Sequence, residues 1–157
     1  MKDKCLSLLR QRGVELGDII DIVFDLQRPY IQDLTREEIE EDILQILDKR
    51  EVYHSLITGI AIDVAVENKS FGDDDICQAI RNDYGLYGVD EVLAYGICNL
   101  YGSIALTNFG YVDKLKPGVI GRVNDDKSRC NTFLDDIIGA IAASAASKIA
   151  HTHRKRL

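Results

Sequence analysis

Hydrophobic residues recur along this chain three or four positions apart, which is the spacing of one face of an α-helix. The stretch 51–68 is typical, because a single apolar stripe runs along it: Val52, Leu56, Ile60 and Val64. No stretch alternates apolar and polar residues with an excess of β-branched side chains, and the chain contains only two prolines. The pattern therefore predicts an all-α fold.

Start and stop signals divide the chain into helices. The clearest start is a capping box, with Thr35 as N-cap and Glu38 three residues later. Pro29 ends the preceding helix, because proline disfavours helical geometry in the residue before it. The predicted helices are 2–12, 17–28, one that follows Thr35 and extends to Leu47, 51–68, 73–82, 89–106 and one from Thr132 into the tail. A break is predicted at 107–110, a half-helix at 111–118 and an exposed loop at 124–129.

The last predicted helix is apolar on nearly all sides after its first turn, which is typical of a helix in the centre of a bundle. Its small residues form a face of low relief that lets another helix approach closely: Gly139, Ala142, Ala143 and Ala146. We expect residues 1–157 to form a single-domain multi-helix bundle around this central apolar C-terminal helix. The same face favours pairing with further copies of the chain, so we also expect a homo-oligomer.

Composition narrows the class of protein. The chain has 157 residues, 46% of them hydrophobic, and a formal net charge of −7, which argues against nucleic acid as a partner. Its four cysteines are scattered without a Cys-x-x-Cys pair, as expected for a reduced cytoplasmic protein. The uncharged stretch 137–147 is shorter than the roughly 20 residues that cross a bilayer. The basic tail 151–157 either complements the end of its helix or makes peripheral contact with an anionic membrane.

Acidic residues interrupt largely apolar sequence in three places. These places are Asp90 with Glu91, Asp113 with Lys116, and Asp135 with Asp136. An ionised carboxylate taken out of water is costly unless a metal, a cation or hydrogen-bond donors compensate it. Grouped carboxylates beside a lysine suit Mg²⁺ that carries a phosphate, so the pattern favours a shared metal site.

Simpler explanations exist for each place. Acids in the first turn of a helix interact with its positive end, which accounts for one acid of a pair better than for two adjacent ones. Asp113 and Lys116 have the spacing of a surface ion pair. A further acid, Asp63, points along the apolar side of the helix 51–68. The acidic run 37–42 is most simply a solvated face; it is similar to the acidic helix of all-α nucleotide pyrophosphatases, but no second acidic helix has matching spacing.

The ordered motifs of the C-terminal half resemble the phosphatidylglycerophosphatase A family. They are Asp90-Glu91 before an apolar helix, then Asp113-x-x-Lys116-Pro117, then Leu134-Asp135-Asp136 leading into Ile-Ile-Gly-Ala-Ile. The resemblance covers about residues 88–146. The Pro-Gly-Thr-x-Gly-Ser stretch of membrane-bound members has no match here, and neither do their transmembrane segments. The chain therefore resembles the short, soluble, all-helical branch of that family.

The resemblance implies a Mg²⁺-dependent phosphatase that removes the terminal phosphate of phosphatidylglycerophosphate, or acts on a related phosphate ester. By motif, the metal or its waters would be held by five acids: Asp90, Glu91, Asp113, Asp135 and Asp136. Lys116 would meet the phosphate, and all six residues would be catalytic. The alternative, from a different class, is a non-catalytic helical protein that binds a phosphorylated ligand or a protein partner through the same acidic pocket.

Overall fold

The computed structural model of the chain describes residues 1–154, which form helices joined by short loops. The helices are α1 (Lys2–Gln11), α2 (Leu16–Gln27), α3 (Arg36–Leu47), α4 (Arg50–Glu67), α5 (Asp74–Arg81), α6 (Val89–Cys98), α7 (Ser103–Leu115), α8 (Val119–Asp125) and α9 (Thr132–Arg154). No strand occurs within residues 1–154. The predicted all-α fold is confirmed.

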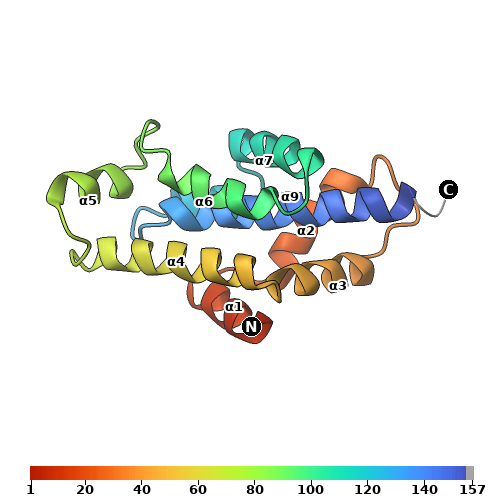
Figure 1. Cartoon of the computed structure of the whole chain (residues 1–157), viewed down its shortest axis with the longest axis horizontal. Helices are drawn as coiled ribbons and strands as arrows, with labels where there is room; N and C mark the ends of the chain where they lie inside the picture. The colour runs from red at the N-terminus through yellow and green to blue at the C-terminus, as the bar shows by residue number, and fades with distance from the viewer. Residues whose placement is uncertain (155–157) are drawn as a thin grey trace.

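Helix α9 forms the axis of the bundle. It runs through the middle of the molecule, with α3 and α4 along one side and α6 and α7 along the other (Figure 1). It also packs against α2 and α8, while α1 lies against α3 and α4. Every residue from Phe133 to Ser147 is buried, which confirms the prediction of a central apolar C-terminal helix.

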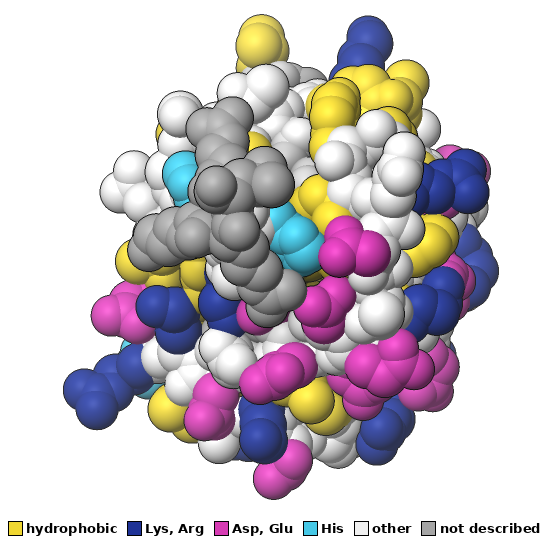
Figure 2. Space-filling view, turned by 90° about the vertical axis from the view of Figure 1, so that its right-hand side faces the viewer, with side chains coloured by type: hydrophobic (Ala, Val, Ile, Leu, Met, Phe, Trp, Pro, Cys, Tyr) yellow, Lys and Arg dark blue, Asp and Glu magenta, His cyan; other side chains and the backbone are white. Residues whose placement is uncertain are grey.

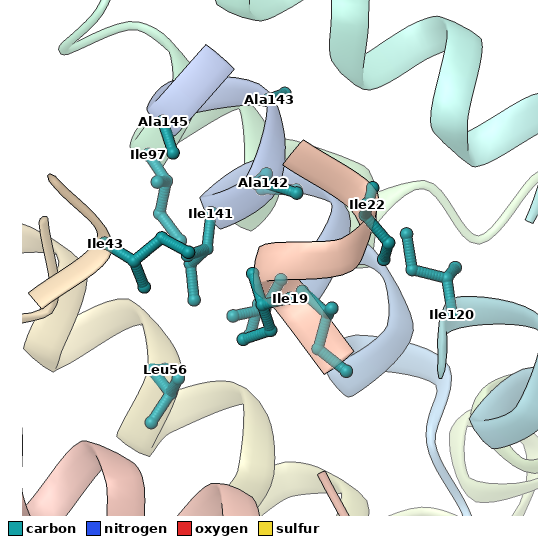
Figure 3. Packing of buried hydrophobic residues seen from close by; sticks show 14 of the residues in the cluster. Ile19, Ile22, Ile43, Leu56, Ile97, Ile120, Ile141, Ala142, Ala143 and Ala145 are labelled. Carbon is teal, nitrogen blue, oxygen red and sulfur yellow. The ribbon is translucent and has the colours of Figure 1, made fainter. Parts of the chain in front are cut away.

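The small residues of α9 let its neighbours come close. Ile43 of α3 and Ile97 of α6 approach Ile141 of α9 in the core, and Ile22 of α2 faces Ile120 of α8 (Figure 3). At Gly139, an added Cβ would lie 3.4 Å from Val112 Cγ2 and 3.5 Å from the Phe109 ring, so α7 fits tightly at this position. The low-relief face is therefore covered within the chain, and the prediction of a homo-oligomer no longer rests on it.

The prediction of one helix over 89–106 and a break at 107–110 was wrong. Helix α6 ends at Cys98, and α7 begins at Ser103 and continues through Gly110 to Leu115. The break lies at Gly102, whose φ of +81° favours glycine, whereas Gly110 is helical and faces open space. Helix α8 was also not predicted, and the loop expected at 124–129 begins only after Asp125.

The surface near the C-terminal end of α9 is mixed, with hydrophobic side chains among charged ones (Figure 2). Acidic and basic side chains are interspersed on this end of the molecule (Figure 2). Glu37, Glu40 and Glu41 of α3 are exposed, as expected for a solvated face. The role predicted for the basic tail 151–157 lies partly outside the described residues, because the structure describes only 151–154 of it. None of the helices within residues 1–154 combines the length and the hydropathy that a membrane span requires.

Helix α4 approaches the start of α9 through Gly59. An added Cβ at this position would lie 2.3 Å from Ile137 Cδ1 and 3.1 Å from Phe133 Cβ. The Cβ of Phe133 cannot move without its backbone, so a larger residue at position 59 would push the two helices apart.

We predict that Gly59→Val lowers the free energy of unfolding by about 1–3 kcal/mol, because it overpacks the contact between α4 and α9. The matched control is Gly110→Val, since Gly110 is also helical but has no atom within 4 Å of an added Cβ. Urea denaturation of both variants measures the difference. Equal stability of the two variants would contradict the close approach described at Gly59.

Candidate metal centre

Three carboxylates meet where the first turn of α6 faces the start of α9. Asp90 and Glu91 belong to α6, and Asp136 belongs to α9. One oxygen from each lies within 4.8 Å of the other two. The two helices pack along each other, so residues 45 positions apart in sequence share one site. We call Asp90, Glu91 and Asp136 the carboxylate cluster.

One oxygen of each residue in the carboxylate cluster lacks a hydrogen-bond donor. Asp90 Oδ1, Glu91 Oε2 and Asp136 Oδ2 are all inaccessible to solvent and have no hydrogen-bond partner among the described residues. Asp90 and Asp136 are each only 4% exposed. Most buried polar atoms in folded proteins have a partner, so three acids that each carry an oxygen without one form a candidate site for a cation.

Lys116 holds the other acids of the predicted site together. Its Nζ lies 2.7 Å from Asp113 Oδ1, 2.7 Å from Asp135 Oδ2 and 3.5 Å from Asp136 Oδ1. Asp136 therefore has one oxygen near the ammonium group and the other in the carboxylate cluster. The pair Asp113–Lys116 is consequently more than a surface ion pair, because the 2% exposed Asp135 shares the same lysine.

A tight turn presents the lysine. Lys116 caps the C-terminal end of α7 in the left-handed conformation, with φ of +49°, which non-glycine residues seldom adopt. Its carbonyl oxygen would lie 2.5 Å from an added Cβ at Gly121, so the turn folds closely onto α8. The Asp-x-x-Lys-Pro motif thus has a structural consequence: it reverses the chain and leaves the lysine side chain at the start of α9.

Burial and like charges shift the pKa values of the acids. Burial, followed by the charge of Asp135, raises the pKa of Asp136 to about 9. Burial and the neighbouring Glu91 raise the pKa of Asp90 to about 8. Burial opposes the charge on Lys116, but Asp135 and Asp113 outweigh it and raise the pKa of its amine. One lysine is therefore not enough positive charge for the acids gathered here.

Burial also raises the pKa of Asp135 to about 6, against the opposing charge of Lys116. The structure thus brings all six predicted residues into one connected group, although only three of the acids contribute to the carboxylate cluster. Asp113 and Asp135 contact the lysine. Their roles as metal ligands or catalytic groups stay predictions.

Two acids near this group were missed or left unassigned by the sequence analysis. Asp83 adopts a φ of +51°, and partial desolvation raises its pKa although the residue is exposed. Its charge in turn raises the pKa of Asp135, which places it beside the site. Asp63, noted as an anomaly on an apolar face, is fully buried and accepts hydrogen bonds from Phe133 N at 3.1 Å and Leu134 N at 3.0 Å. Its position on an apolar stripe was the available signal, whereas nothing in the sequence indicated Asp83.

The carboxylate cluster fits a divalent cation. Mg²⁺ and Ca²⁺ take oxygen ligands at about 2.0–2.6 Å, so oxygens within 4.8 Å of one another can share one ion. Interaction with the dipole of α6 alone does not explain the arrangement, because Asp136 comes from α9 and brings a third carboxylate to the same place. All the candidate ligands are oxygen atoms, which favours a hard cation.

Comparison with known proteins gives consistent results. A model of the family "Phosphatidylglycerophosphatase A" matches residues 9–151. "Uncharacterized protein YutG" of Bacillus subtilis is 47% identical over 155 residues, which cover 98% of this chain and 93% of the relative. The crystal structure of ypjQ from Bacillus subtilis is 42% identical, with a TM-score of 0.94 over 100% of this chain and 97% of that one. The structure of low temperature requirement C protein from Listeria monocytogenes is 45% identical, with a TM-score of 0.92 over 98% and 96%.

We predict that divalent cations stabilise this protein through the carboxylate cluster. At a concentration of Mg²⁺ or Mn²⁺ 100 times the Kd, the gain in the free energy of unfolding is about 2.7 kcal/mol. Asp90→Asn should remove most of this gain, and its metal-free stability should equal or exceed that of wild type, because it removes a carboxyl group whose ionisation burial opposes. Thermal unfolding with and without the cation measures both effects.

Asp42→Asn is the matched control for that experiment. Asp42 is a carboxylate of the same size that pairs with Lys148 at 2.7 Å, and it lies on α3 outside the carboxylate cluster. The control should keep the full cation-dependent gain. A cation effect that is equal in the two variants would show that the ion binds elsewhere.

Proposed function

The chain belongs to the phosphatidylglycerophosphatase A family, and from this premise we propose that it is a Mg²⁺-dependent phosphatase. Its substrate is the terminal phosphomonoester of phosphatidylglycerophosphate or a related phosphate ester. The observation that carries the proposal is the set of three buried carboxylate oxygens without donors in the carboxylate cluster, next to Lys116. A cation site beside an ammonium group suits a phosphate, which needs positive charge on several oxygens.

The proposed chemistry divides between the cation and the side chains. A divalent cation held by the carboxylate cluster would neutralise phosphate charge and lower the pKa of water. Lys116 would bind a phosphate oxygen as a point charge, and the Asp113 and Asp135 carboxylates would orient its ammonium group. Asp136 faces both the cluster and the lysine, so it would fix the distance between the cation and the phosphate.

Exposed apolar residues near Asp90 and Glu91 in the sequence support a lipid-bearing substrate. Val89 and Val92 flank the two acids of α6 and are exposed, and Leu86 in the preceding loop is completely exposed. An amphiphilic ester could place its phosphate at the acids and its apolar part on these side chains, which would also give peripheral membrane contact.

We further propose that the family domain includes α1, since this helix packs on α3 and α4. The cytoplasmic location and the homo-oligomer stay predictions.

We predict that Asp136→Asn lowers kcat by about 100-fold or more, in line with the loss of one group that stabilises transition-state charge. Release of phosphate from a short-chain phosphatidylglycerophosphate analogue, with and without Mg²⁺, measures the effect. The protein should remain folded, because the substitution keeps the shape of the side chain. Wild-type protein that binds the analogue but releases no phosphate with any divalent ion would favour the non-catalytic binding protein.

Lys116→Met should raise KM and lower kcat in the same assay, since a positive charge on the phosphate is lost. Lys148→Met is the matched control: both lysines pair with acids, and they are 26% and 25% exposed. The control variant should retain wild-type kinetics. Equal losses in the two variants would mean that Lys116 acts only through stability.

A further inference from the structure

One face of α4 contacts the first turn of α9 and the residues that precede it. Gly59, Asp63 and Glu67 lie four residues apart and so form one stripe along the helix. We call these three residues the α4 stripe. Gly59 leaves space for Phe133 and Ile137, as described above. Asp63 and Glu67 accept hydrogen bonds from backbone N–H groups at the start of α9 and just before it.

Asp63 takes the place of a helix cap. Its two oxygens accept from consecutive N–H groups, Oδ1 from Phe133 at 3.1 Å and Oδ2 from Leu134 at 3.0 Å. These N–H groups belong to the first turn of α9, where a capping side chain normally binds. Asp63 belongs to α4 rather than α9, so the cap also ties two helices together.

The residue that would usually cap α9 is engaged elsewhere. Asn131 precedes the helix, and asparagine is a preferred N-cap. Its Oδ1 accepts from Arg12 Nη2 at 2.7 Å, and its Nδ2 donates to Val123 O at 2.8 Å. The side chain therefore anchors α1 and α8, which leaves the N–H groups of the first turn to Asp63.

Glu67 adds a third backbone contact. Its Oε1 accepts from Cys130 N at 2.8 Å, and the carboxylate forms two hydrogen bonds with the guanidinium group of Arg12, at 3.1 and 2.6 Å. The acids of the α4 stripe thus accept three N–H groups from five consecutive residues, 130–134. The next two residues are Asp135 and Asp136.

We propose that Asp63 is a positioning residue for the carboxylates of α9. It fixes the rotation of the first turn, so that Asp135 meets Lys116 and Asp136 meets the cluster. Side chains lie about 5–6 Å from a helix axis, so a rotation of 10° moves them by about 1 Å. A shift of 1 Å is enough to weaken a metal or catalytic site strongly. The expected effect on the metal or catalytic site rests on the proposed function, whereas the hydrogen bonds made by Asp63 do not.

The test compares Asp63→Asn with wild type in the full chain. Asparagine has the same shape, but its NH₂ group would face one of the two backbone N–H groups, so the bidentate cap is lost. We expect Mn²⁺ affinity, measured by calorimetry, to fall by about 10–100-fold, although every residue of the carboxylate cluster is present. The metal-free crystal structure of the variant should show the Asp135 and Asp136 carboxylates displaced.

Leu56→Ala is the control for general loss of stability. Leu56 is fully buried on the same helix, two turns before Asp63, and its truncation costs about 2–5 kcal/mol. At a temperature where all variants are folded, its Mn²⁺ affinity should stay within threefold of wild type. If Asp63→Asn does not fold, Gly59→Ala displaces the same turn by contact alone and should weaken Mn²⁺ binding in the same direction.

The outcomes separate the two proposals. Asp63→Asn with unchanged affinity and unmoved carboxylates would overturn the positioning role, and so would an equal loss of affinity in Leu56→Ala. Wild-type protein that binds no Mn²⁺ would overturn the proposed metal-dependent function. In that case the displacement of the carboxylates in the variant structure still decides whether Asp63 positions them.

Discussion

The crowding of buried carboxyl groups at the start of α9 is the constraint on which the rest of this structure depends. Asp90, Asp135 and Asp136 are buried, yet Lys116 pairs only with the last two of them among the described residues and is already shared with Asp113. Burying uncompensated charge costs several kcal/mol, and native proteins are stable by only about 5–15 kcal/mol in total. The arrangement therefore lowers the stability of the folded protein, and a cation bound at these acids would offset that cost.

The surrounding architecture holds these charges in place. Helix α9 is enclosed by its neighbours and cannot move easily, and α4 binds its first turn through the α4 stripe. The turn at Lys116, with its left-handed backbone, brings an ammonium group from α7 to the same place. Each of these contacts comes from a different part of the chain, so the site exists only when the whole bundle is folded.

The sequence revealed the fold class because helical periodicity is local. It located most helices, and the apolar character of α9 indicated its central position. The break between α6 and α7 was misplaced because Gly102 and Gly110 look alike in sequence, whereas only Gly102 adopts a positive φ. The six acidic and basic residues of the site were identified by motif, but their connections were not. Whether Asp135 or Asp136 makes the shorter contact with Lys116 depends on the rotation of α9, and Asp83 is placed by a turn that no local pattern predicts.

The most direct test of the account is the anomalous diffraction of a crystal soaked with Mn²⁺. We expect one peak between Asp90, Glu91 and Asp136, about 2.0–2.6 Å from an oxygen of each. A peak at a different acidic site, or no peak at these oxygens at a Mn²⁺ concentration that supports phosphatase activity, would contradict the account.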